Sequence, residues 1–199
     1  MKNIIIIGAG LSGIYAATLL QKNYNVTILE ARERIGGRIL TVDWFDMGPS
    51  WVWQHQKYIL ALIQENNLEI FAQYTQGEAL YDTPGKIERF SPPPSAPSAR
   101  INGGVVALVE ALEKKLILDT IKLNSSVISV ENSDKGVIVK TNSETYIADI
   151  VINTLPPRVA VTTITYTPKL PQDIVQNLAS IPTWMGNSTK CTVVFKTPF

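Results

Sequence analysis

The sequence predicts an α/β fold in which a parallel sheet carries a helix on its face. Three observations support this expectation. Ile4 to Ile7 form a short, wholly apolar run, as in a strand buried on both faces of a parallel sheet. A helical pattern follows, with Leu11, Tyr15 and Leu19 on one stripe. A second apolar run, Val26 to Leu29, comes next, so the stretch forms a strand-helix-strand unit.

The turn between the first strand and the helix contains Gly8, Gly10 and Gly13, spaced as G-x-G-x-x-G. Gly8 allows a tight turn, Gly10 lets the backbone approach a pyrophosphate, and Gly13 lets the helix pack close to the sheet. Leu11 and Ser12 open the helix, whose free N–H groups and positive dipole end attract phosphates. An ordinary tight turn is the alternative, but the strand-helix-strand context favours a Rossmann-like dinucleotide site.

The second strand ends at Glu30, whose carboxylate suits a ribose diol and would repel the 2′-phosphate of NADP. A second phosphate-binding pattern follows, because two adjacent glycines allow a backbone nest and nearby arginines add positive charge. A nicotinamide dehydrogenase does not need this second loop, whereas a large, permanently held dinucleotide such as FAD does. The candidate cofactor-binding residues of this stretch are Glu30, Ala31, Arg32, Gly36, Gly37 and Arg38.

The segments GAGLSG and ILEARERIGGR resemble the start of the flavin-dependent amine oxidases, the family that includes monoamine and polyamine oxidases. The resemblance implies an FAD-binding domain with a parallel sheet and a β-meander, plus the beginning of a substrate-binding lobe. Phe45 to Trp51 resembles the family's D-x-G-x-x-W segment, which runs along the flavin ring. Gly48, Pro49, Ser50 and Trp51 are therefore expected to contact the flavin, with a core aromatic cluster as the alternative.

Two later residues are assigned through the resemblance alone. Val127 matches the family residue that holds the adenine through main-chain hydrogen bonds. Lys190 lies in a G-x-x-x-K-C block, residues 186–191, whose lysine holds a water near flavin N5 in the family. Without the resemblance, Lys190 is more often a solvated lysine on a strand, which the alternation of Cys191, Val193 and Phe195 predicts. With it, Lys190 is the candidate catalytic residue.

The remaining elements follow from apolar periodicity. The expected helices cover 57–66, 105–116 and 173–181, and the expected strands cover 68–72, where the strand is half-buried, and several segments between 121 and 154. Residues 82–100 contain five prolines and three serines, so we expect an extended or flexible segment. In the family a long helical section of the substrate lobe lies here, which implies that part of the pocket wall is absent or replaced.

We expect the chain to alternate between two lobes. The first part of the FAD-binding domain covers 1–50, an excursion into the substrate lobe 51–100, the return 101–157, and an incomplete lobe section 158–199. The family continues beyond this length, so the chain is expected to be truncated: a shortened piece, the product of a disrupted gene, or half of a split protein. An exposed sheet edge then predicts self-association or a C-terminal partner.

Composition excludes several other functions. The chain has 199 residues, of which 45% are hydrophobic, and a net charge of +1, so neither nucleic acid nor an anionic membrane is expected as a partner. The single cysteine, Cys191, allows no internal disulfide, and the single histidine, His55, suggests a solvated residue rather than a metal site. No signal peptide or membrane-spanning stretch is visible, so a cytoplasmic location is expected.

The expected function is that of an FAD-dependent amine oxidase, which transfers a hydride from the α-carbon of a small-molecule amine to the flavin, with oxygen as acceptor. Two alternatives stay open. Protoporphyrinogen oxidases and carotenoid desaturases are similar over the first stretch and near Gly103 and Gly104, although they do not characteristically have a lysine like Lys190. An incomplete, non-catalytic flavin-binding fragment or subunit is the second alternative, and it accounts better for the length of the chain.

Overall fold

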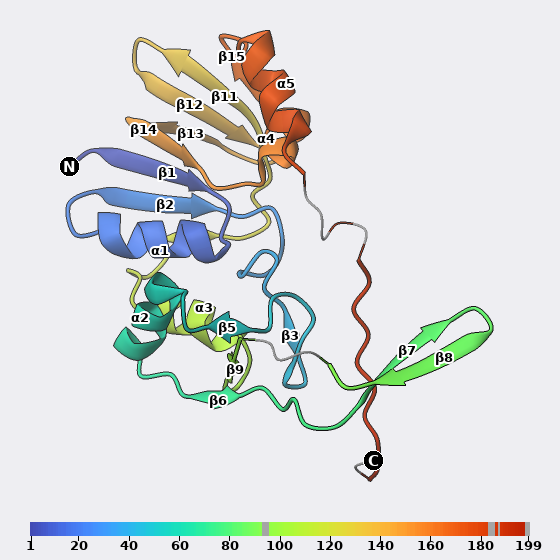
Figure 1. The fold of residues 1–199 in the computed structure, drawn as a ribbon. Helices are drawn as coiled ribbons and strands as arrows, with labels where there is room; N and C mark the ends of the chain where they lie inside the picture. Colours follow the sequence, from blue (N-terminus) through green and yellow to red (C-terminus); the bar gives the residue numbers. More distant parts are fainter. Residues whose placement is uncertain (93–95, 183–185, 187, 198–199) are drawn as a thin grey trace.

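The computed structural model describes residues 1–92, 96–182, 186 and 188–197. In this part of the chain it has five helices and fifteen strands, arranged around a small parallel sheet (Figure 1). The helices are α1 (Leu11–Leu20), α2 (Lys57–Glu65), α3 (Val106–Glu113), α4 (Pro157–Thr163) and α5 (Gln172–Ser180). None of these helices has the length and apolar character needed to cross a membrane.

The strands of the described residues form five sheets. The parallel sheet has the order β10 (Ile121–Lys122), β2 (Asn25–Leu29), β1 (Asn3–Ile7) and β14 (Ile150–Asn153). The meander sheet has the order β13 (Thr145–Ala148), β12 (Gly136–Thr141), β11 (Val127–Ser133) and β15 (Thr165–Thr167). The smaller sheets are β3 (Thr41–Val42) with β4 (Phe45–Asp46), β5 (Val52–Trp53) with β9 (Ser98–Ile101) and β6 (Ile70–Ala72), and the hairpin of β7 (Ala79–Thr83) and β8 (Lys86–Phe90).

The central strand β1 is buried on both faces, which confirms the predicted α/β fold. Ile4 and Ile6 pack into a core formed with α1 and α3, whereas Ile5 and Ile7 pack into a second core against the meander sheet. Successive side chains of a strand point to opposite faces, so an unbroken apolar run is what a strand between two cores requires. Figure 1 shows the meander sheet and α1 on opposite sides of the β1–β2 pair.

Helix α1 has a buried face that differs from the predicted stripe. The buried residues are Gly13, Ile14 and Ala17, whereas Leu19 is 52% exposed. The reason is close packing, because a Cβ on Gly13 would lie 2.0 Å from the carbonyl oxygen of Gly8. Gly13 and Ala17 allow this close approach, and Ile14 packs into the core beside them.

The segment 82–100 is more regular than predicted. Strands β7 and β8 pair in register from Ala79 with Phe90 to Thr83 with Lys86, and Gly85 has a φ of 84° at the turn. A Pro-Gly pair between alternating residues is a known hairpin signal, which the proline content obscured. Residues 93–95 of this segment lie outside the described residues. The strand predicted at 68–72 is present as β6, but its residues are exposed rather than half-buried.

The predicted strand at 191–195 is absent. Cys191 and its neighbours run as an extended, exposed chain with no strand assignment, drawn in red in Figure 1. Alternation alone does not make a strand, since a strand also needs a neighbouring strand with free backbone groups. Periodicity also missed α4 and β15, both of which are short. The predicted helix at 173–181 is present as α5, although none of its residues is buried.

Candidate functional site

The G-x-G-x-x-G loop leaves an open space at the start of α1. The amide N–H of Gly8 donates to the Leu29 carbonyl oxygen at 2.9 Å, and Gly8 has a φ of 101°, so the chain turns sharply out of β1. Gly10 occupies the N-cap position of α1, and no side chain caps the helix. A Cβ on Gly10 would find no atom within 4 Å. The N–H groups of Leu11 and Ser12 therefore open toward a space that only a ligand or solvent fills.

The second glycine pair packs directly against the first loop. The amide of Gly36 donates to the Ala9 carbonyl oxygen at 2.8 Å, and Gly36 forms an isolated parallel bridge with Gly10. A Cβ on Gly37 would lie 3.3 Å from the Cα of Gly10. We call these two loops, residues 8–13 and 36–37, the double-glycine cradle. It places two phosphate-binding patterns from different parts of the sequence in one location.

The arginines of this stretch differ in the contacts that they make with the second glycine loop. Arg34 donates to three carbonyl oxygens, those of Ile35 at 3.0 Å, Gly37 at 2.9 Å and Ile39 at 3.2 Å. Arg34 therefore fastens the second glycine loop. Arg32 donates to the Gly37 oxygen at 3.1 Å, whereas the exposed Arg38 makes no side-chain hydrogen bond to any described residue.

Glu30 joins the cradle to the segment that leads into β11. Its buried carboxylate accepts from the amide of Ala9 at 2.8 Å and from the amide of Arg32 at 3.0 Å. Each oxygen keeps a second lone pair that a hydroxyl can use. The Glu30 carbonyl also accepts from the Ser125 amide at 2.7 Å. Val127, two residues further on and buried, is thereby held near the end of β2. The exposed Ala31 lies between these contacts.

Lys190 contacts the 48–51 segment although about 140 residues separate them in the sequence. Its Nζ donates to the Gly48 carbonyl oxygen at 3.0 Å and also to the Ser50 hydroxyl. The same Nζ lies 5.6 Å from the ring centroid of Trp51, within the range of a cation–π interaction. Ser50 is buried, whereas Lys190 and Pro49 are exposed. The structure therefore brings together the residues that the resemblance had placed around the flavin ring.

Two residues missed by sequence reasoning hold this segment in place. The buried carboxylate of Asp46 accepts from the Thr41 hydroxyl at 2.7 Å and from the Val105 amide at 2.8 Å. Arg100 lies 3.6 Å from its second oxygen. Asp46 opens the D-x-G-x-x-W segment, and Arg100 precedes the Gly103–Gly104 pair by three residues. In the sequence, each of them is a charged residue between two apolar neighbours, and this pattern could have identified them.

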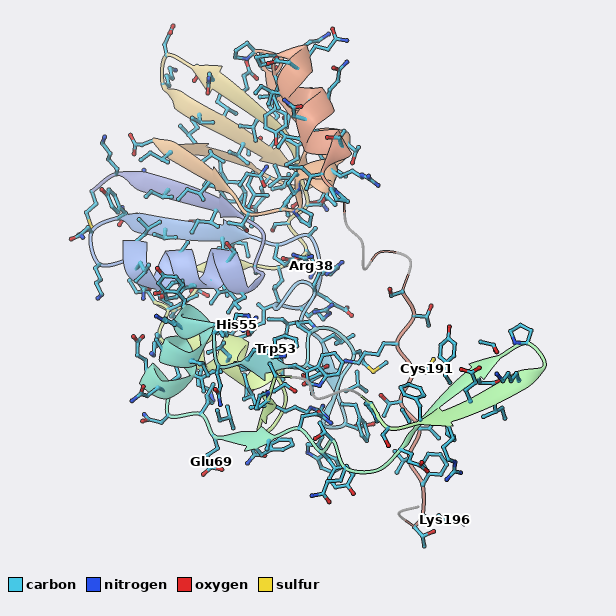
Figure 2. The ribbon with its side chains drawn as sticks, viewed as in Figure 1. Arg38, Trp53, His55, Glu69, Cys191 and Lys196 are labelled. Atoms are coloured by element: carbon cyan, nitrogen blue, oxygen red, sulfur yellow. The ribbon has the colours of Figure 1, made fainter. Side chains whose placement is uncertain are left out.

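An apolar cavity of about 570 Å³ opens beside these residues. Its lining includes the predicted cofactor-binding residues Leu11, Pro49 and Trp51, and the rest of it is formed by Ile39, Val52, His55, Gln56, Lys57, Tyr58, Ile59, Ile101 and Val105. Figure 2 shows His55 next to Trp53 at the level of β5, and their rings stack with centroids 6.4 Å apart. The volume and the apolar lining are typical of small-molecule sites. The described residues contain no cluster of His, Cys, Asp or Glu that could hold a metal ion.

Comparison with known proteins identifies the family. The sequence model described as "flavin containing amine oxidoreductase" matches residues 11–100 and 94–199. The chain belongs to this family. Putrescine oxidase of Kocuria rosea is 39% identical over 88 residues, which are 42% of this chain and 18% of that protein. The flavin-containing amine oxidase B of Mus musculus is 25% identical over the whole chain and 58% of its own length.

Solved structures of family members share the fold. Putrescine oxidase bound to putrescine superimposes with a TM-score of 0.76 and 21% identity, over 89% of this chain and 63% of that one. Cyclohexylamine oxidase from Brevibacterium oxydans gives a TM-score of 0.78 at 18% identity, with the same coverage. The chain therefore spans less than two thirds of the proteins that it resembles.

The family model matches the chain in two parts, which locates a difference between this chain and its relatives. The two parts meet at residues 94–100, within the proline-rich segment. The alignment with the mouse protein extends over 304 positions, whereas this chain has 199 residues, so at least 105 positions of that protein have no counterpart here. These findings agree with the expectation that a section of the substrate lobe is missing between β8 and β9.

Proposed function

We propose that the double-glycine cradle binds FAD. The fit rests on the open space at Gly10, which a Cβ would fill, on the uncapped start of α1, and on the adjacent nest at Gly36 and Gly37. Glu30 has free lone pairs for the ribose diol, and its charge disfavours NADP. Ala31, Arg32 and Arg38 are proposed to flank the cofactor, and the hydrogen bond from the Ser125 amide to the Glu30 carbonyl oxygen supports the proposal that the main chain at Val127 receives the adenine.

We further propose that the chain is the flavin-binding part of an FAD-dependent amine oxidase. When bound, FAD supplies the redox chemistry, in which a hydride leaves the α-carbon of an amine and oxygen later accepts the electrons. The observation that carries this proposal is the position of Lys190 against Gly48, Ser50 and Trp51. An ammonium group with two acceptors keeps a third N–H for a water molecule, which is the role that the family resemblance implies.

The apolar cavity gives the remaining residues a function. Trp51 and Pro49 provide flat, apolar surface for an aromatic ligand, and Leu11 and Ile39 connect this surface to the cradle. Such a lining offers an apolar surface for the carbon skeleton of a small amine. The residues of this chain would thus bind and orient the reactants, and no side chain here is assigned as a general base.

A second candidate function is an incomplete flavin-binding subunit without turnover. Two findings favour it: the chain spans 63% of putrescine oxidase, and at least 105 internal positions of the mouse protein have no counterpart. Exposed apolar residues on the β7–β8 hairpin, among them Leu80, Ile87 and Phe90, support self-association or a partner that supplies the C-terminal part. A cytoplasmic location belongs to either proposal and is supported by the single cysteine.

The visible spectrum of the purified chain after incubation with FAD tests cofactor binding, and peroxide release from added amines tests turnover. We expect a bound flavin spectrum whose chromophore, released by denaturation, is FAD. Lys190→Met should keep FAD bound but slow flavin reduction or reoxidation at least tenfold, whereas Lys196→Met, a control in the same extended segment, should leave both rates unchanged. A chain that rejects FAD contradicts the first proposal, and bound FAD without peroxide favours the non-catalytic subunit.

A further inference from the structure

We propose that Asp46 is a positioning residue for Lys190 and acts on it through the turn formed by residues 46–50. The role of Lys190 in amine oxidation belongs to the proposed function, on which the catalytic meaning of this inference rests. The mechanical link between the two residues stands on the geometry of the chain alone. We call residues 46–50 the anchored turn.

The first step is the fixation of Asp46. The residue is 2% exposed, and its Oδ1 accepts from both the Thr41 hydroxyl and the Val105 amide. The Val105 amide lies at the start of α3, where a helix favours negative charge. Gly104 has no space for a side chain, because a Cβ would lie 2.9 Å from Oδ1 and 2.5 Å from a Thr41 carbon. Asp46 therefore fastens one end of the anchored turn to the Gly103–Gly104 loop.

The second step is the packing of the turn itself. A Cβ on Gly48 would lie 2.1 Å from the Arg38 carbonyl oxygen, so the turn lies directly on the backbone that follows the cradle. The hydroxyl of Ser50 is buried and lies 3.4 Å from the carbonyl oxygens of both Asp46 and Gly48. The turn is thus held on one side by Arg38 and on the other by Asp46, and its carbonyl groups have little freedom.

The third step is the dependence of Lys190 on this turn. Among the described residues, its side-chain hydrogen bonds go to Gly48 and Ser50, and its cation–π contact is with the adjoining Trp51. Lys190 itself comes from an extended segment without strand pairing, and that segment makes a further contact to the turn, from the Thr192 hydroxyl to the sulfur of Met47 at 3.9 Å. The acceptors on the anchored turn, rather than the backbone around Lys190, therefore set the position of the ammonium group.

Arg100 explains why a carboxylate is needed at position 46. Its guanidinium lies 3.6 Å from Oδ2, which has no hydrogen-bond partner among the described residues, and the Arg100 Nε is likewise buried without one. In Asp46→Asn the amide keeps an acceptor for Val105 but loses the charge that faces Arg100. A neutral amide whose N–H groups face the guanidinium would turn or move, and the main chain at residue 46 would move with it.

Lysine reactivity measures this link without any flavin. The apoprotein is treated with a limiting amount of acetic anhydride, and mass spectrometry gives the rate at Lys190 relative to Lys196, an exposed lysine of the same segment. Two hydrogen bonds and an aromatic contact should slow Lys190 by about fivefold to tenfold. In Asp46→Asn we expect the ratio to rise toward one. The matched control, Asp82→Asn on the exposed β7–β8 hairpin, should leave the ratio unchanged.

An unchanged ratio in a folded Asp46→Asn protein overturns the inference. Folding is checked by circular dichroism and by the midpoint of urea unfolding. If Asp46→Asn does not fold, the variant Thr41→Val tests the inference instead, because it removes one of the two hydrogen-bond donors to Asp46 Oδ1. For this variant we expect the labelling rate of Lys190 relative to Lys196 to rise to a value between those of the parent and Asp46→Asn. A ratio equal to that of the parent would refute the proposal.

The same variants separate this inference from the proposed function. If Asp46→Asn changes the Lys190 ratio and the parent chain also oxidises amines, the variant should lower the rate of flavin reduction or reoxidation while FAD stays bound. If the ratio changes but the parent chain has no oxidase activity, the positioning role stands and the proposed function fails. If the parent is active and the ratio does not move, the function stands and the positioning role is wrong.

Discussion

Gly10→Ala is the sharpest test of the double-glycine cradle, because the structure predicts a small effect on folding and a large effect on FAD binding. The backbone of Gly10 has φ −74° and ψ 175°, a conformation that any residue adopts. Its Cβ would meet no atom within 4 Å. Alanine is less favourable than glycine at a helix N-cap, but it also restricts the unfolded chain, and the two effects oppose each other. We expect the free energy of unfolding to change by less than about 1 kcal/mol.

The effect on FAD binding should be much larger. The new methyl group would occupy the space in front of the first N–H groups of α1, where the pyrophosphate is proposed to lie. The loss of one or two charge-assisted hydrogen bonds, at about 1.5 kcal/mol each, weakens binding by roughly tenfold to a hundredfold. Gly13→Ala provides the contrast, since its Cβ would lie 2.0 Å from the Gly8 oxygen and overpacking should cost about 2–3 kcal/mol of stability.

Urea unfolding measures the first quantity, and titration of the apoprotein with FAD, followed by quenching of flavin fluorescence, measures the second. A Gly10→Ala protein that binds FAD within about twofold of the parent would refute the reasoning, because the open space at Gly10 would then not be the phosphate site. A large loss of stability in Gly10→Ala would show that the space is filled by the protein itself.

Three further substitutions test the structural supports of the site. Arg34→Met removes three hydrogen bonds to carbonyl oxygens, so we expect the free energy of unfolding in urea to fall by about 2 kcal/mol and amide exchange at residues 35–39 to become faster. Unchanged amide exchange would contradict the role of Arg34 in holding the second glycine loop. Arg100→Met leaves the buried Asp46 carboxylate without its countercharge and should lower the free energy of unfolding by about 3 kcal/mol. A second change, Asp46→Asn, should restore part of this loss, and no recovery in the double variant would argue against the ion pair. Ile6→Ala creates a cavity beneath α1 and should lower stability by about 3–4 kcal/mol, and a loss below about 1 kcal/mol would be incompatible with its full burial.

The first 40 residues show how far local sequence information reaches. The apolar run of β1, the glycine spacing and the acidic end of β2 together predict a strand-turn-helix-strand unit, and the structure confirms it. The family assignment from these motifs is also confirmed. The close packing predicted for Gly13 is confirmed, whereas the predicted stripe does not give the buried face of α1, because Leu19 is exposed. That face depends on how near the helix lies to the sheet, which the contact of Gly13 with the Gly8 carbonyl sets.

Later parts of the chain show where local information fails. The alternation around Cys191 predicts a strand, but the described residues supply no neighbouring strand, so the segment stays extended and exposed. The β7–β8 hairpin was missed because the prolines of residues 82–100 predicted an extended or flexible segment, although Pro84 and Gly85 form the hairpin turn. The division of the chain into four lobe sections stays a prediction, as do the contacts of the individual site residues with FAD.

By itself, the sequence determined the strand-helix-strand unit, the presence of two glycine loops and the family, because each of these depends on residues close together in the chain. The tertiary structure alone decided that the two glycine loops form one cradle, that Asp46 lies between Thr41 and Val105, and that Lys190 lies on the turn of residues 46–50. The physical reason is that these contacts join segments separated by up to about 140 residues. Such contacts form only when the whole chain packs, with separate cores on the two faces of the parallel sheet.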